Sequence, residues 1–357
     1  MSTRSETGLH GEYKVPGGKL VVVDLDVAEG VLKNVTVSGD FFLEPEDAFE
    51  AIHRALRGAP ADLDAAGISA RVRAELPEDA VLVGLTADAI GITVRRALAR
   101  ATHWSAYDWH LIHGEPQHPA MQMALDEVLI NQVSSGNRKP TLRIWEWASP
   151  AIVIGNFQSV RNEVDQEAAE REGVRVVRRI SGGGAMFIEP GNSITYSLYV
   201  PPELVGGMSY VESYAFLDEW VIAALGDLGI KAWYQPINDI TSEIGKIAGA
   251  AQKRLASGAV LHHVTMSYDM DADKMARLLR IGREKVSDKG VRSANKRVDP
   301  LRRQTGMSRE QVIEAMVGSF RRRYGLLDDT VTGEEKAAAA ELARTKHSEP
   351  AWINRVP

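Results

Sequence analysis

The 357-residue chain contains no cysteine. This absence excludes disulfide bonds, thiolate zinc sites, iron–sulfur clusters held by cysteine, and cysteine nucleophiles. Long apolar runs are also absent, because no stretch approaches the ~18 consecutive apolar residues that a membrane-spanning helix needs. The first residues, MSTRSETGLHGEYK, lack the apolar core of a secretory signal. We therefore expect a cytoplasmic protein with no membrane partner.

Positive charge is scarce over most of the chain. The 42 Lys and Arg residues are outnumbered by 48 Asp and Glu residues, which gives a net charge of −6. A basic surface for general nucleic-acid binding is therefore not expected. Residues 274–323 are the exception, with 15 basic and 5 acidic residues. This segment is either a pair of solvated helices or a surface that steers an acidic partner. Nucleic acid is not expected as a partner, since stacking aromatic residues are missing there until Phe320.

The length and the changes of pattern predict two domains. We expect a flexible tail over residues 1–10 and a small α+β domain over 11–100, with strands before residue 42 and helices from about 45, 61 and 86. Residues 101–350 form the larger domain, with predicted helices at 120–132, 163–172, 209–228, 272–280 and 308–324. Its predicted strands are 141–147, 151–157, 174–179, 193–200, 244–254 and 258–270. The fold class is therefore α+β, with mixed or antiparallel sheets flanked by helices.

A glycine-rich segment, RRISGGGAMFIEPGN at residues 178–192, lies between two predicted strands. It matches neither the P-loop nor the dinucleotide-binding G-x-G-x-x-G pattern. Its three glycines would let the backbone approach a ligand closely and direct N–H groups at anionic oxygens. Arg178 and Arg179 could bind phosphate or carboxylate, but strand alternation should send them to opposite faces, so that at most one reaches a ligand. A glycine-rich hairpin with solvated arginines is equally compatible with these residues.

A second candidate segment, NDITSEIGKIAGAAQKR, occupies residues 238–254. Lys246 lies there in an apolar strand between Gly245 and Gly249. A partly buried ammonium group needs a counter-charge, either from Asp239 or from a bound anion. The alternative is an ordinary surface lysine on a strand. The neighbouring His262 and His263 should point to opposite faces of their strand, and no metal site is expected from them.

These segments, in the order RRISGGGA, GNSITYSL, ND, KIAGAAQKR and VLHHVTMSYDMDADKMARLL, resemble the lipoate-protein ligase family. That family belongs with the biotin ligases and is structurally akin to class II aminoacyl-tRNA synthetases. The similarity runs from about residue 121 to 324 and extends to the closing PAWINR. GEYKVPGGKLVVVDLDVAEG and VSGDFF resemble the accessory domain of the family, which in many members follows the catalytic domain or is a separate chain. Here it comes first.

The resemblance implies an ATP-dependent ligase that converts lipoate or octanoate to an acyl-adenylate. The acyl group would pass to a lysine on an acidic lipoyl domain, of a 2-oxoacid dehydrogenase complex or of the glycine cleavage H protein. Lys246 matches the catalytic lysine of the family, and Asp239 matches the acidic residue near the adenylate and Mg²⁺. The implied substrate- and ATP-binding residues are Arg178, Arg179, Ser181, Gly182, Gly183, Gly184, Ala185, Phe187, Asn238, Asp239, Gly249, Ala251 and His263.

Further expectations concern the surroundings of this site. The apolar candidates for an acyl channel are Trp145, Ile154, Ala185, Met186 and Phe187, although core packing explains any one of them better than a ligand does. The polar residues 283–297 are the candidate for a loop that orders over the adenylate. A monomer is expected.

One departure from the family pattern follows the glycines, where most family ligases have His-Asp and this chain has Ile188-Glu189. It keeps open a non-catalytic protein that binds lipoate or an adenylate, and a cysteine-independent acyltransferase of the same superfamily. Octanoyltransferases and amidotransferases of the superfamily rely on a cysteine nucleophile, which this chain lacks. Biotin ligases carry arginines interleaved among the glycines, a pattern not found here. The retained Lys246 favours the ligase.

Overall fold

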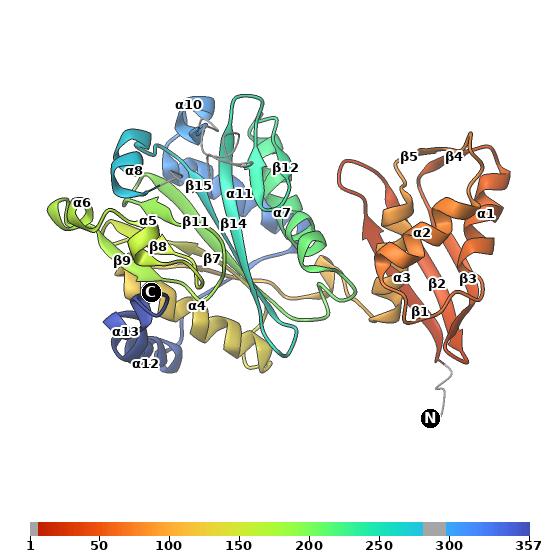
Figure 1. Ribbon diagram of the computed structural model, residues 1–357, viewed down its shortest axis with the longest axis horizontal. Coiled ribbons are helices and arrows are strands. Elements are labelled where there is room, and N and C mark those ends of the chain that lie inside the picture. The colour runs from red at the N-terminus through yellow and green to blue at the C-terminus, as the bar shows by residue number, and fades with distance from the viewer. Residues whose placement is uncertain (1–5, 281–297) are drawn as a thin grey trace. The chain divides into compact units, whose positions relative to one another are not determined.

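The structure, a computed structural model, describes residues 6–280 and 298–357 (Figure 1). The chain forms two compact units, one with residues up to Ala106 together with 202–216, and one with 107–201 and 217–357. The first unit thus ends a few residues beyond the predicted boundary at 100 and includes a segment from the middle of the chain. The predicted tail of residues 1–10 is too long, because the first strand begins at Glu6.

The first unit contains a three-stranded antiparallel sheet in the order β1 (Glu6–Lys14), β2 (Leu20–Ala28), β3 (Val31–Gly39). Its helices are α1 (Asp47–Leu56), α2 (Ala65–Glu75) and α3 (Ala87–Leu98), and a two-stranded ribbon pairs β4 (Phe42–Glu44) with β5 (Val81–Val83). A short 3₁₀ turn, η1 (Trp104–Ala106), ends this part of the chain. Arg96 of α3 donates from Nη1 to the carbonyl oxygen of Leu204 (3.1 Å), which attaches residues 202–216 to this unit.

The second unit contains a large sheet of eight strands. Their order is β12 (Trp233–Gln235), β13 (Asp239–Thr241), β14 (Lys246–Arg254), β15 (Val260–Ser267), β11 (Ser193–Val200), β7 (Thr141–Trp145), β6 (His110–His113) and β16 (Leu327–Asp329). Neighbouring strands are antiparallel as far as β7, whereas β6 pairs in parallel with both β7 and β16. A smaller sheet has the order β10 (Met186–Ile188), β8 (Ala151–Ile154), β9 (Arg175–Arg178). The predicted α+β class with mixed and antiparallel sheets is confirmed.

The helices after residue 107 are α4 (Pro119–Ser134), α5 (Val160–Glu163), α6 (Gln166–Arg171), α7 (Tyr210–Asp227), α8 (Ala272–Leu278), α10 (Leu301–Thr305), α11 (Arg309–Tyr324), α12 (Gly333–Leu342), the π-helical turn η2 (Ala343–His347) and α13 (Pro350–Ile353). Of these, α7 begins in the first unit and continues into the second at Leu217. The helix predicted over 163–172 is α6, which begins only at Gln166 because Asp165 caps it by accepting from the backbone N–H of Ala168 (2.9 Å). Every helix among the described residues is too short or too polar to span a bilayer.

Both faces of the large sheet are covered, since every residue of the central strand β11 is buried. On one face Tyr196 packs against Trp220 of α7, with ring centroids 4.9 Å apart, and Trp220 packs against Phe320 of α11. On the other face the hydroxyl group of Tyr199 donates to Asp126 of α4 (2.6 Å). Because side chains alternate along a strand, this second face is the one on which β11 and its neighbours present polar groups toward α4.

Candidate functional site

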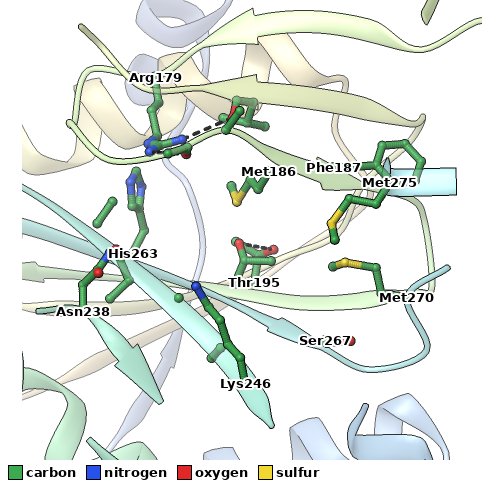
Figure 2. A pocket seen from close by; sticks show the side chains of 18 of the residues that line it. Arg179, Met186, Phe187, Thr195, Asn238, Lys246, His263, Ser267, Met270 and Met275 are labelled. Carbon is green, nitrogen blue, oxygen red and sulfur yellow. Dashed lines mark hydrogen bonds between the residues drawn. The ribbon is translucent and has the colours of Figure 1, made fainter. Parts of the chain in front are cut away.

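A cavity of about 270 Å³ lies between the large and small sheets. Figure 2 shows Lys246 and His263 on the large sheet, with Met186 and Phe187 of β10 opposite and Arg179 directly after β9. This volume is close to the lower end of the ~300–1,000 Å³ range of small-molecule sites. The predicted site residues that line it are Arg179, Gly184, Ala185, Phe187, Asn238, Lys246, Gly249, Ala251 and His263.

The remaining predicted site residues do not line the cavity. Among the described residues, the lining does not include Arg178, Ser181, Gly182, Gly183 or Asp239. All but Arg178 contact residues that do line the cavity, as the following geometry shows. The fold therefore places the predicted residues, with the exception of Arg178, in the lining of one cavity or in contact with that lining.

Lys246 is the first residue of β14, and its ammonium group has a carboxylate partner. Its Nζ lies 2.7 Å from Oδ1 of Asp239, which sits on the adjacent strand β13. A Cβ atom on Gly249 would lie 3.0 Å from Nζ, so glycine at this position leaves room for the ammonium group. The N–H group of Asp299 donates to the carbonyl oxygen of Lys246 (2.9 Å) and holds its backbone. Asp239, one of the two predicted counter-charges, thus pairs with Lys246.

Arg179 shapes the glycine loop from within. Its Nη2 donates to the carbonyl oxygens of Gly182 (2.6 Å) and Gly184 (2.9 Å). Gly183 has φ +91°, and a Cβ there would lie 2.9 Å from the same nitrogen. The loop can therefore wrap around the guanidinium group only with glycine at its centre.

Arg178 faces the other way, as strand alternation predicted. Its buried guanidinium group donates to the carbonyl oxygens of Gly155 (2.8 Å), Gln158 (2.7 Å) and Ile353 (2.5 Å). The indole N–H of Trp352 donates back to the carbonyl oxygen of Arg178 (3.1 Å). The structure thus places Arg178 outside the cavity, where it ties the C-terminal segment to β9.

A chain of hydrogen bonds runs from the glycine loop into the sheet. Arg179 Nε donates to Ser181 Oγ (3.0 Å), which lies 2.6 Å from His263 Nε2, and His263 Nδ1 lies 2.8 Å from Asp126 Oδ2. Burial lowers the pKa of His263, although the hydrogen bond that its ring donates to Asp126 opposes this effect. The imidazole ring is therefore neutral near pH 7. Since the carboxylate can only accept, Nδ1 carries the proton and Ser181 donates to Nε2.

Asp126 is the centre of this network, and sequence reasoning missed it. Its Oδ1 also accepts from Ser197 Oγ (2.8 Å), Tyr199 Oη (2.6 Å) and Arg143 Nη1 (3.3 Å). A signal was present, because Asp126 falls on the buried stripe of α4 that contains Met123, Ile130 and Val133. A lone carboxylate on a buried helix face needs donors from elsewhere in the fold.

His262 points to the opposite face, as predicted for adjacent strand residues. Its Nε2 lies 2.7 Å from Asp218 Oδ1, and its Nδ1 accepts from Gln252 Nε2 (2.9 Å) because Nε2 carries the proton toward the carboxylate. Among the described residues, no three histidine or acidic side chains are arranged to hold a metal ion. Both histidines are thus parts of hydrogen-bond networks.

The apolar wall of the cavity includes Trp145, Ala185, Met186 and Phe187, as the sequence suggested. Ile154 instead packs in the core behind Phe187. Further apolar wall residues that the sequence did not single out are Met123, Val153, Met270, Met275 and Leu279. Methionine is unbranched and adaptable, and it suits a wall that must fit a flexible apolar ligand.

The basic segment 274–323 is largely paired where the structure describes it. Carboxylates bind Lys274, Arg277, Arg302, Arg303, Arg309, Arg321, Arg322 and Arg323. Several of these acids come from outside the segment, so much of its positive charge is compensated locally. The loop predicted to close over the site, 283–297, lies outside the described residues.

Comparisons with known proteins identify relatives of this site. The family described as lipoyl protein ligase A/B catalytic domain matches residues 118–321. An octanoyltransferase LipM of Kyrpidia tusciae is 31% identical over 266 residues, which cover 66% of this chain and 94% of the relative. The lipoate-protein ligase A subunit 1 of Thermoplasma acidophilum is 28% identical and covers 66% of this chain and 92% of its own.

A solved structure agrees with these sequence relationships. It is that of a bi-partite lipoate protein ligase from the archaeon Thermoplasma acidophilum, reported with its E2 lipoyl domain. This structure is similar with a TM-score of 0.61 and 27% identity, and covers 70% of this chain and 98% of its own.

Proposed function

Because the chain belongs to the lipoyl protein ligase A/B catalytic domain family, we propose that it is an ATP-dependent lipoate-protein ligase. It activates lipoate or octanoate as an acyl-adenylate and transfers the acyl group to a lysine of a lipoyl domain. The observation that carries the proposal is the Lys246–Asp239 pair at the wall of an apolar cavity, in a chain without cysteine. The relatives include both transferases and ligases, and these residues favour the ligase.

In the first half-reaction an oxygen of the fatty acid carboxylate attacks the α-phosphorus of ATP. The bond from that phosphorus to its bridging oxygen breaks, and pyrophosphate leaves with the electron pair. Two anions must approach each other, so a fixed positive charge lowers the barrier. Lys246 supplies that charge, and Asp239 holds its ammonium group in place until the anions arrive.

In the second half-reaction the amine nitrogen of the acceptor lysine attacks the carbonyl carbon, and AMP leaves with the electron pair. The nitrogen loses one proton and an amide bond forms. A mixed anhydride is a reactive acyl donor, so positioning supplies much of the rate. No protein nucleophile is required, which agrees with the absence of cysteine.

The residues present fit ATP and Mg²⁺. Gly249 and the glycine loop leave backbone accessible where side chains would otherwise fill the space. Mg²⁺ commonly binds one or two carboxylates together with substrate phosphates and water, and Asp239 provides one such carboxylate. A bound Mg²⁺ would neutralise charge on the phosphate oxygens.

The test is ATP–pyrophosphate exchange with lipoate, octanoate and biotin as separate acids. We expect exchange with lipoate or octanoate. Lys246→Ala should lower the exchange rate ~10²–10³-fold, as loss of one transition-state charge does, with unchanged circular dichroism and Tm. Lys253→Ala, on the same strand β14 but outside the cavity lining, is the matched control and should exchange normally. No exchange with any acid would refute the ligase, and exchange with biotin alone would change the substrate.

One observation favours a second function. Ser181, His263 and Asp126 are linked like a nucleophile, base and orienting acid. A cysteine-independent acyltransferase would use Ser181 to accept an octanoyl group from a carrier protein. Against it, Ser181 is fully buried and its oxygen already accepts from Arg179. ATP-free transfer with an acyl ester on Ser181, detected by mass spectrometry, would establish this route. ATP-dependent transfer without the ester supports the ligase.

A further inference from the structure

Lys274, in helix α8, is bound to the strand segment on the opposite side of the cavity's apolar end. Its Nζ lies 2.7 Å from Glu189 Oε1 and 3.5 Å from Glu172 Oε2. The same nitrogen lies 5.5 Å from the centre of the Phe187 ring, which lines the cavity. The side chains of Lys274 and Glu189 are 22% and 18% exposed, so the pair is shielded from much of the solvent.

Helix α8 and its ends provide one side of the cavity. Met275 lies on the helix, with Met270 before it and Leu279 directly after it, and all three line the cavity. Figure 2 shows Met270, Met275 and Phe187 gathered at one end. Met186 and Phe187, from β10, line the facing side.

The two ends of α8 are held differently. At its C-terminal end, two main-chain hydrogen bonds join it to the segment before α6. The N–H group of Asp165 donates to the carbonyl oxygen of Leu278, and the N–H group of Arg280 donates to that of Glu163, both at 2.9 Å. In its first turn, the side chain of Lys274 donates a hydrogen bond to Glu189, directly after β10. Movement of this first turn away from β10 would widen the cavity, and the ion pair opposes it.

Glu189 is prepared for this contact. Its Oε2 accepts from Nδ2 of Asn192 (3.1 Å), which orients the carboxylate before it meets Lys274. The preceding Ile188 is completely buried in a cluster with Trp145 and Val153. The two residues that differ from the family pattern thus have separate roles, since one fills the core and the other binds α8.

We propose that Glu189 and Lys274 are a positioning pair that sets the width of the cavity's apolar end and thereby selects the acyl chains that fit. The inference rests on the proposed function for its assay. It assigns chain selectivity to an ion pair behind the wall, beyond the apolar residues that touch the chain.

The experiment measures pyrophosphate exchange with hexanoate, octanoate, decanoate, dodecanoate and lipoate. In Glu189→Gln, α8 is less firmly held, so the KM for the preferred acid should rise about tenfold, which corresponds to ~1.4 kcal/mol. The KM for the longer acids should rise less or fall, because a wider cavity admits them. The KM for ATP should stay within about twofold, because the ion pair lies at the apolar end of the cavity. A twofold change in KM corresponds to far less than the ~1.4 kcal/mol of a tenfold change.

Two further variants separate positioning from general stability. Arg277 lies on the same helix, its side chain is 58% exposed, and its Nε is 3.7 Å from Oε1 of Glu172. Arg277→Gln should therefore retain the wild-type chain-length profile. Lys274→Arg keeps the positive charge between Glu189 and Glu172 and should also retain the wild-type profile. If Glu189→Gln only lowered the fraction of folded protein, the rate would fall equally for every acid and the ratios of the KM values would not change. This result would overturn the inference.

Failure of the proposed function gives a different result from failure of this inference. If the wild type exchanges with no acid, calorimetric binding of octanoate and dodecanoate without ATP replaces the assay. A changed affinity ratio in Glu189→Gln would then support the positioning pair. An unchanged ratio would refute it, whichever activity the protein has.

Discussion

Replacing Asp126 by asparagine should damage both the stability of the catalytic unit and the geometry of its cavity. Asp126 is buried and accepts hydrogen bonds from Ser197, Tyr199, His263 and Arg143. Asparagine has nearly the same shape but carries no charge, and one of its two polar atoms donates. The substitution therefore changes the chemistry of the network without creating a cavity.

The cost to stability comes mainly from Arg143, which is also buried. Its guanidinium group would keep the hydrogen bond to Gln122 and the contact with the Trp145 ring, whose centre is 4.8 Å away. It would lose its negatively charged partner. Removing one partner of a buried ion pair typically costs about 3–5 kcal/mol. For a unit of this size each 1 kcal/mol lowers Tm by roughly 2–4 °C, so we expect a fall of ~10 °C.

The effect on the site follows from the histidine tautomer. If the asparagine NH₂ group faces His263, Nδ1 must accept and the ring proton moves to Nε2. Ser181 then loses the acceptor for its own hydroxyl proton, and the contact that orients Arg179 and the glycine loop is weakened. Displacement of a reacting group by 1 Å can cost ~10²-fold, so we expect a 10–100-fold lower exchange rate.

Asp218→Asn is the matched control, because Asp218 binds His262 on the opposite face of the same strand. It should lower Tm while leaving the activity per folded molecule near that of the wild type. The measurements are thermal unfolding, ¹⁵N NMR of the histidine tautomers, and exchange normalised to folded protein. The reasoning is refuted if Asp126→Asn keeps the Nδ1–H tautomer and full activity, or if Asp218→Asn reduces normalised activity equally.

Two other outcomes are expected. The lowered pKa of His263 means that the unfolded chain binds a proton that the folded chain does not, so stability should fall as pH drops below about 6.5. The free energy of unfolding of His263→Gln should depend less on pH between 7.5 and 5.5, and an identical slope in both proteins would contradict this. Arg178→Met should lower the free energy of unfolding by about 3 kcal/mol, because several charge-assisted hydrogen bonds are lost. Proteolysis near Trp352 should be faster, and an unchanged cleavage rate would count against the proposed anchoring.

The longer elements were predictable because their patterns extend over enough residues. The alternation in SITYSLYV and the helix before Gly229 both match the structure. Three-residue strands such as β10, β12 and β16 are too short to show a period, and they were missed. The parallel pairing of β6 with β16 also had no local signal, since it joins segments over 200 residues apart.

The site was predictable where its chemistry is local. Residue type alone indicates that the backbone can approach a ligand closely at glycines 182–184 and 249. It also indicates a partly buried charge at Lys246, which lies in an apolar strand. Alternation also separated Arg178 from Arg179 and His262 from His263. The partners of these side chains were not predictable, because they come from distant segments such as Asp126 in α4, 137 residues before His263.

Glu189 shows why the identity of a partner decides the meaning of a residue. From the sequence, Ile188-Glu189 marked a departure next to the glycines, and the carboxylate could equally have faced a substrate. In the fold its partner is Lys274, 85 residues later, and the pair joins two sides of the apolar wall. A change of residue type beside a binding site therefore need not remove or alter a ligand contact. It can instead move the control of the cavity's width to an ion pair behind the wall, and the chain-length profile of Glu189→Gln tests this distinction.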